Sequence, residues 1–259
     1  MATGRTTSKY ARVYVDGYDL SGYTRSIGPV TWSFAQVDCA SMIDDLKGFL
    51  PGQPIVNVGA LNAIYDNTAT TGIQAIGSAG NGTQRTVLVP LGIRAVPAIG
   101  DPCFGGQFIQ GEYSAAVSTD GQITANLPFT GWSASASTLL YSKPWGKLVH
   151  ANSSETGANS SGTAGESSAT GAATAFGGYA VFMLFSSSGA VTLKIQDSVD
   201  EVNGNYGDLI SSGSLDASVT PTCALVALAK TATVKLYTRW QASGLGTASF
   251  AIGFFRAYN

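Results

Sequence analysis

The amino-acid sequence predicts an all-β protein, and three features of the 259-residue chain support this. Apolar and polar residues alternate with a period of two over most of the length, which places one side of each extended segment in a core. The alternating runs are short and rich in β-branched and aromatic residues. Gly, Asn, Asp and Pro separate them, as in proteins built from strands and tight turns.

The first half of the chain predicts a series of strands joined by tight turns. The expected strands lie at residues 12–15, 31–34, 55–65, 86–94, 107–117 and 122–129. Asp16-Gly17 follows the first of them, and Asp120-Gly121 lies between the last two. Asp-Gly pairs favour two-residue hairpin turns because both positions then adopt a positive φ, so each pair predicts a β-hairpin.

Residues 41–52 interrupt the alternation and predict the one short helix of the fold. Ser41 and Asp44 form a capping box, the apolar residues that follow have helical spacing, and Pro51-Gly52 ends the segment. The plainer interpretation is that this apolar stripe covers one face of a sheet. The alternative is that the segment lies at the rim of the fold and contacts a neighbouring copy. The subunit-interface residues are then Met42, Leu46, Phe49 and Leu50.

A change of composition divides the chain into two expected units. Residues 151–175 contain only Ala, Asn, Ser, Glu, Thr and Gly, so a Gly/Ser/Ala-rich linker or long loop is expected over 146–175. The first unit covers 1–145. The second covers 176–259 and predicts a smaller, Ig-like β-sandwich. Its expected strands lie at 179–186, 190–196, 222–228, 234–240 and 247–256.

Charged residues are scarce, which excludes several classes of function. Lys and Arg number 14 and Asp and Glu 16, so 12% of the chain is charged, against about 25% in ordinary soluble domains. The formal net charge is −2, and no segment concentrates basic residues. Proteins that grip nucleic-acid phosphates need such a cluster, and so do proteins that bind acidic substrates or membrane surfaces.

The three cysteines and the single histidine are widely spaced. Cys39, Cys103, Cys223 and His150 do not form the four-ligand cluster of a structural zinc site. An odd, sparse set of cysteines is also a poor disulfide framework, which suits a reducing cytoplasm. The longest strongly apolar run, residues 179–185, is too short for a membrane-spanning helix, and no secretory signal is expected.

No segment matches a catalytic motif, so no catalytic residue, cofactor or metal ion is expected. Residues 131–135 fail the nucleophile-elbow pattern at its last position. His150 borders the polar segment 151–175 and is not expected to be held in register for a catalytic triad. Residues 77–83 are rich in glycine but lack the lysine of a phosphate loop, so a hairpin or loop is expected there. Composition alone leaves open a glycosidase pair among Asp44, Asp45, Glu112 and Glu166.

Carboxylates gather between Asp197 and Asp208, where two interpretations remain. Oxygen ligands in a loop suit calcium, although their order here departs from the usual calcium-loop pattern. The favoured interpretation is a solvated connection, because Asp, Asn and Gly are also the residues of tight turns.

The four tryptophans also allow two interpretations. Aromatic side chains can line a sugar-binding face, and they equally pack sandwich cores, which is the favoured interpretation. The residues are Trp32, Trp132, Trp145 and Trp240.

The chain has few charged residues, many expected strands and no cluster of catalytic residues. Together these features indicate a protein that assembles from identical copies. Charged residues are depleted at the centres of protein–protein contacts. Identical copies that meet head to tail close into rings or continue as filaments.

Several segments resemble tail tube proteins of bacteriophages with long, non-contractile tails. The opening match is residues 11–23, Ala-Arg-Val-Tyr-Val-Asp-Gly-Tyr-Asp-Leu-Ser-Gly-Tyr, followed by the helix-like stretch after Val37-Asp38 and by Leu50-Pro51-Gly52. The second unit is similar to the extra β-sandwich that some of these proteins append. Its matching segments are 193–198, 207–209, 237–240 and 251–256.

The resemblance implies a tail-tube-type β-sandwich or barrel with one short helix, followed by the second sandwich. It implies homo-hexameric rings that stack into a tube, contact other tail proteins and let genomic DNA pass without specific binding. The location implied is the virion tail, assembled in the cytoplasm of the host bacterium and without a membrane. Two alternatives stay open: a capsid decoration or other virion structural protein, and a carbohydrate-binding β-sandwich module.

Overall fold

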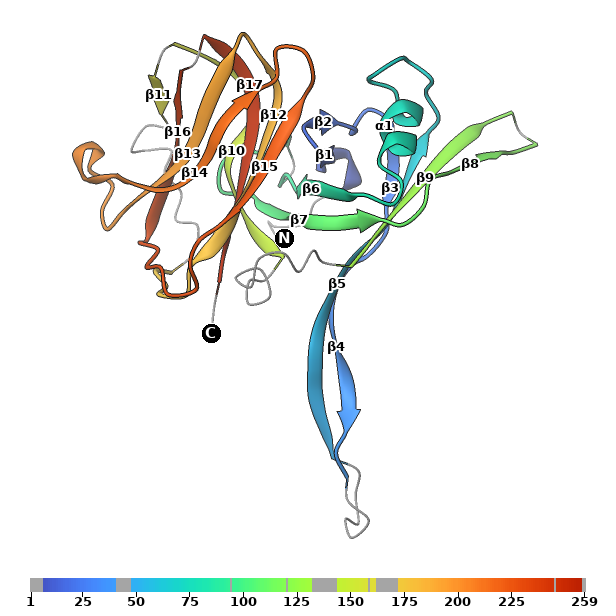
Figure 1. Ribbon diagram of the computed structural model, residues 1–259, viewed down its shortest axis with the longest axis horizontal. Coiled ribbons are helices and arrows are strands. Elements are labelled where there is room, and N and C mark those ends of the chain that lie inside the picture. Colours follow the sequence, from blue (N-terminus) through green and yellow to red (C-terminus); the bar gives the residue numbers. More distant parts are fainter. Residues whose placement is uncertain are drawn as a thin grey trace.

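The computed structural model confirms the all-β prediction. It describes residues 7–40, 48–93, 95–119, 121–131, 144–157, 159–161, 172–244 and 246–257. The strands form one large antiparallel sheet and a smaller four-stranded sheet (Figure 1). Among these residues, no helix has the length and hydrophobicity needed to cross a membrane.

The N-terminal half wraps strands around its own apolar core. Its strands are β1 (Tyr14–Val15), β2 (Tyr18–Asp19), β3 (Thr24–Ile27), β4 (Val30–Asp38), β5 (Phe49–Ile64), β6 (Gln84–Pro90), β7 (Pro102–Gln110), β8 (Ser114–Val117) and β9 (Ile123–Thr130). The order β7-β6-β1-β2 forms one layer, and β8, β9 and β5 form the other, with β3 and β4 both paired to β5. The core between them includes Val15, Leu61, Phe104, Phe108 and Leu127, all fully buried.

Both Asp-Gly turn predictions fall on β-hairpins. Asp16 and Gly17 have φ angles of 50° and 84° and join β1 to β2. Gly121 has a φ of 78° in the connection between β8 and β9, which pair as an antiparallel hairpin. Asp16, Gly17 and Gly121 thus adopt the positive φ that Asp-Gly turns favour, at the reversals where the sequence predicts them.

The expected helix over 41–52 is wrong where the structure describes it. Residues 41–47 lie outside the described residues, and Phe49 to Gly52 form the start of strand β5. The extended conformation there is stabilised by pairing with β4, which supplies partners for residues 49–58. Tertiary strand pairing has overridden the local helical spacing.

The helix of the fold is instead α1 (Ile73–Ala79), where the glycine-rich segment predicts a hairpin or loop. Glycines in this helix and at its C-terminal end allow side chains from other elements to pack close to its backbone. A Cβ atom on Gly77 would lie 2.5 Å from the Tyr113 ring, and one on Gly80 would lie 1.4 Å from Nη1 of Arg85. The Arg85 and Gln110 side chains donate hydrogen bonds to the carbonyls of Ile76 and Gly77 at the helix end.

The expected linker over 146–175 is wrong for residues 146–156. These residues belong to strand β10 (Trp145–Thr156), which pairs with β7 at its start and with β17 along its length. Leu148, Val149 and His150 are buried. The small polar residues after His150 form a strand because backbone pairing with a neighbour does not require apolar side chains. Strand β11 (Asn159–Ser161) follows, and residues 162–171 lie outside the described residues.

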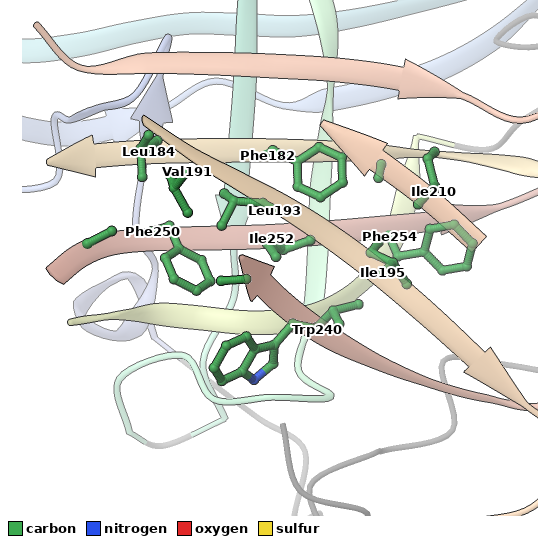
Figure 2. Packing of buried hydrophobic residues seen from close by; sticks show 14 of the residues in the cluster. Phe182, Leu184, Val191, Leu193, Ile195, Ile210, Trp240, Phe250, Ile252 and Phe254 are labelled. Carbon is green, nitrogen blue, oxygen red and sulfur yellow. The ribbon is translucent and has the colours of Figure 1, made fainter. Parts of the chain in front are cut away.

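The C-terminal half is a β-sandwich. Its strands are β12 (Gly178–Ser187), β13 (Ala190–Ser198), β14 (Gly207–Asp216), β15 (Thr222–Ala227), β16 (Tyr237–Ser243) and β17 (Thr247–Arg256). The layer β15-β12-β17-β10 faces the layer β11-β16-β13-β14. Figure 2 shows the core between them, in which Phe182 of β12 and Ile252 of β17 face the aliphatic side chains of β13.

One sheet and one core join the two halves. The large sheet continues from β10 to β7 and so runs through both halves. A further buried cluster lies on the opposite side of β12 from the sandwich core and includes Tyr179, Leu88 and Phe255. The Tyr179 hydroxyl donates to the Gly105 carbonyl at 2.8 Å. Strand β12 is thus buried on both faces.

The β1–β2 turn packs directly against the C-terminal half. A Cβ atom on Gly17 would lie 2.5 Å from the Thr222 carbonyl oxygen and 2.9 Å from that of Leu184. The turn is also fixed from its own side, because Asp16 accepts a hydrogen bond from the Thr86 backbone and pairs with the buried Arg85. Glycine at position 17 is therefore required by both the φ angle and the close approach.

Substitution Gly17→Ala is expected to destabilise the fold more than Gly121→Ala. Both glycines have positive φ, but a Cβ atom on Gly121 would meet nothing within 4 Å. The Gly121→Ala variant serves as the control and should lower the free energy of unfolding by about 1–2 kcal/mol, because alanine is strained at a positive φ. Gly17→Ala should cost about 1–3 kcal/mol more because the added methyl group overpacks the junction. Chemical denaturation of both variants measures this, and equal losses would contradict a close-packed junction.

Candidate assembly surface

A long two-stranded ribbon projects from the body of the protein (Figure 1). It consists of β4 and residues 49–57 of β5, and we call it the arm. Strand β4 pairs only with β5, and β9 pairs with β5 only from Val58 onward. Among the described residues, neither outer edge of the arm has a partner strand. A strand edge of this kind is a template on which a strand of another chain can pair.

One face of the arm exposes aromatic side chains. Trp32 and Phe34 lie two residues apart on β4 and so point to the same face, with their ring centroids 5.3 Å apart. Trp32 is 39% exposed and Phe34 is 45% exposed. Val56, directly opposite Trp32 on β5, supports this face from the base of the arm. Val56 belongs to the N-terminal core, so Trp32 and Phe34 extend that apolar face beyond the core into the arm.

The distal part of the arm contains two of the four predicted interface residues. Phe49 is 51% exposed and Leu50 is 59% exposed, and as neighbours on a strand they point to opposite faces. Their expected helical arrangement is wrong, because both belong to β5. Met42 and Leu46 lie outside the described residues. Within the described arm, Asp38 is the only charged residue.

The base of the arm belongs to a four-stranded region whose outer face carries a row of uncharged polar side chains. The strands follow the order β3-β5-β9-β8, and one row of side chains crosses all four. This polar row consists of Ser26, Asn62, Asn126 and Ser114, joined by consecutive cross-strand pairs. The Asn62 amide donates to the Ser26 hydroxyl at 3.2 Å. The opposite face of the same strands places Leu61 and Leu127 in the core.

The two edges of this region are complementary in direction. Strand β8 forms one edge, and β3 with β4 forms the other. All pairs in the order β3-β5-β9-β8 are antiparallel, so the two edge strands run in opposite directions. The β8 edge of a second copy, placed beside β3 of the first, would continue the alternation as an antiparallel pair.

The carboxylates between Asp197 and Asp208 face different partners. Asp197 accepts a hydrogen bond from the Lys235 backbone, and Asp200 accepts one from the Asn205 amide. Asp208 lies 2.6 Å from Nζ of Lys194, and the hydrogen bonds from Lys194 and Gln196 lower the pKa of its carboxyl group. No group of three potential metal ligands occurs among the described residues.

His150 is firmly held, contrary to the expectation from its neighbouring sequence. It is 2% exposed, and its Nδ1 atom lies 3.0 Å from the Phe250 carbonyl oxygen on the paired strand. Its ring stacks on Phe250 at 4.1 Å and contacts Trp240 edge-on. Pairing of β10 with β17 fixes the residue, which therefore packs the sandwich core.

The tryptophans divide between core and surface. Trp240 is buried in the sandwich core, whereas Trp145 is 44% exposed at the start of β10. Trp132 lies outside the described residues, as do Ser133, Asp44, Asp45 and Glu166. Glu112 is exposed in the connection between β7 and β8. The described tryptophans thus do not gather into a single aromatic face.

Comparison with solved structures finds distant similarity, as one example shows. No family model matches the chain, and no curated protein matches it. A similar solved structure is that of the SPP1 Dit protein (gp 19.1), described as a paradigm of the hub adsorption apparatus in phages that infect Gram-positive bacteria. The identity is 12%, the match covers 96% of this chain and 99% of that one, and the TM-score is 0.35. These values are too low to assign a family.

The three cysteines are expected to differ sharply in reactivity. Cys39 is exposed at the distal end of the arm, where its backbone N–H bonds to Gly48. Burial raises the pKa of Cys103, and burial followed by the Asp16 charge raises the pKa of Cys223 to about 12. Because the thiolate is the reacting form, a disulfide reagent at pH 8 should modify one thiol per native chain rapidly.

The denatured chain serves as the control and should react at all three cysteines. A second thiol that reacts as fast as Cys39 in the native protein would show that the junction between the two halves opens.

Proposed function

We propose that this protein is a structural component of a virion that polymerises as stacked hexameric rings to form a bacteriophage tail tube. The observation that supports this most directly is the projecting arm, whose outer edges have no partner strand among the described residues and whose aromatic face is exposed. The resemblance of residues 11–23 to the first residues of tail tube proteins suggests how the copies are arranged. The number six and the tube come from that resemblance.

The arm is an unfavourable structure for an isolated chain. A two-stranded ribbon without a packed face is marginally stable in water, and long, uncharged edges promote association. Covering the exposed 39% of Trp32 and 45% of Phe34 with a neighbouring copy would stabilise the assembly by roughly 0.6–1.3 kcal/mol per side chain, because full burial of a wholly exposed side chain contributes about 1.5–3 kcal/mol. The lack of charge on most of the arm removes the usual electrostatic barrier to such contact.

The four-stranded region provides the contact within a ring. Pairing of β8 in one copy with β3 of the next is head to tail, and such contacts close into a ring when the rotation between copies is suitable. Each copy adds four strands of alternating direction, so the antiparallel pattern is preserved at every junction. Ring closure also removes both open edges of this region.

The polar row then faces the lumen of the ring. The row lies on the face of these strands that is opposite the core. Its four side chains are uncharged and hydrophilic: Ser26, Asn62, Asn126 and Ser114. Tight binding of DNA requires Lys or Arg to neutralise phosphates. A hydrophilic surface without basic side chains at this row lets DNA slide past without being held.

The arm extends beyond this region and provides the contact between rings. Nine residues of extended β4 span about 30 Å at roughly 3.3 Å per residue, enough to reach past the edge of one ring. Ring formation and stacking therefore depend on different parts of the same β5 strand.

Substitutions of the exposed aromatic residues are expected to block stacking while the monomer stays folded. The variant Trp32→Ser with Phe34→Ser removes two aromatic side chains that are 39% and 45% exposed on the arm. Negative-stain electron microscopy should show tubes for the unmodified protein and single rings or monomers for this variant. The matched control is Val219→Ser, which removes a side chain that is 94% exposed outside the arm.

Two outcomes would contradict this proposal. One is that the unmodified protein remains monomeric at high concentration or forms small closed oligomers, as a decoration protein does. The other is that the double variant forms tubes as readily as the Val219→Ser control.

Cys39 provides a reporter of the arm that requires no substitution. Its thiol is exposed in the isolated chain and lies at the end of β4. Assembly through the arm should slow its modification by a thiol reagent at least tenfold relative to the unassembled chain at the same pH. If the modification rate of Cys39 is unchanged in tubes seen by electron microscopy, the arm does not take part in the contacts between copies.

A further inference from the structure

A pocket of about 280 Å³ lies where the β1–β2 hairpin meets the C-terminal sandwich. Its lining combines aromatic and polar side chains. The residues important here are Tyr18, Asp19, Tyr23, Asn152, Phe185 and Ser249. Its volume is near the lower end of the range for small-molecule sites, so it suits a compact ligand.

The aromatic side of the pocket is fixed by packing. Tyr18, Tyr23 and Phe185 are each half-buried, so part of every ring is accessible. The Phe185 ring is held by an edge-on contact with Tyr14, with centroids 4.8 Å apart and planes at 69°. Such rings offer flat apolar surfaces to a ligand that has an apolar face of its own.

The polar side of the pocket presents an acceptor and a donor together. Asp19 Oδ1 accepts the Ser21 backbone N–H at 2.9 Å, and its Oδ2 lies 3.5 Å from the Asn152 amide nitrogen. The Ser249 hydroxyl donates to the Asn152 carbonyl oxygen at 3.2 Å. An ionised carboxylate accepts about four hydrogen bonds, so acceptor capacity remains on Asp19 for a ligand, whereas the Asn152 amide group is shared between Asp19 and the Tyr14 side chain.

The charge of the pocket restricts the ligand. Asp19 is the one charged residue of its lining, so phosphates and carboxylates are repelled. Hydroxyl groups suit this site, because each hydroxyl can donate a hydrogen bond to the Asp19 carboxylate and carries no charge to be repelled by it. Cyclic sugars combine such hydroxyls with apolar C–H faces that pack on aromatic rings.

We propose that this pocket binds one ring of a neutral saccharide. The rings of Tyr18, Tyr23 and Phe185 pack against its C–H face, and Asp19, held by Asn152, accepts hydrogen bonds from its hydroxyls. The site draws on β2 from one half and on β10, β12 and β17 from the other, so it exists only because the halves are rigidly joined. It is preformed, since both polar groups are already oriented by hydrogen bonds.

Saturation-transfer NMR of the full chain tests this with glucose, galactose, N-acetylglucosamine and rhamnose, and with choline as a cationic probe. At least one sugar should bind, and Asn152→Ala and Tyr18→Ala should each weaken its binding at least tenfold. Asn152 is exposed, so its variant should keep the melting temperature of the unmodified protein. The matched controls Asn205→Ala and Tyr237→Ala, outside the pocket, should leave binding unchanged.

Three results would overturn the proposal: no sugar in the panel binds, choline binds and no sugar does, or sugar binding persists in both pocket variants. The measurement does not depend on polymerisation, because the pocket lies within one chain. Sugar binding and tube formation can therefore fail independently.

Discussion

The burial of β12 on both faces is the constraint on which the rest of the structure depends. Alternate residues of this strand serve two cores: Phe182 and Leu184 pack in the sandwich, and Tyr179, Val181 and Met183 pack against the N-terminal half. A strand shared in this way cannot shift by one residue without exchanging both sets of side chains. The two halves therefore share one register, and the base of the arm, the polar row and the pocket at the junction are held relative to one another.

The sequence patterns predict those parts of the fold that depend on interactions between residues close in sequence. The period of two and the Asp16-Gly17 turn reflect preferences between residues close in sequence. The apolar run of residues 179–185 is typical of a strand that is buried on both faces. The patterns failed where pairing with a distant segment decided the outcome. Helical spacing near Phe49 was overridden by β4, and the polar residues after His150 became a strand because β17 lies beside them. Glycines 77 and 80 suggested a loop, but they serve close packing around a helix.

The candidate surfaces were less accessible to prediction than the fold. Phe49 and Leu50 were singled out as contact residues, and they are exposed on the arm, although the helix that suggested them is absent from that position. The polar row and the pocket left no sequence signal. Asp19 and Asn152 are 133 positions apart, and only the long-range order of the large sheet brings them together. Such sites depend on topology, which periodicity and composition do not encode.

The length of β5 has a mechanical consequence. Its 16 residues run without interruption from the arm into the N-terminal core, where β3 flanks one edge and β9 the other. A pull on the arm along its axis therefore loads the hydrogen bonds of the core sheet side by side, in shear, so that many must break at once. A sideways pull would instead open them one after another. Tension directed along the arm is the kind of load that this connection resists best, and a contact made at the distal end is transmitted directly into the body of the protein.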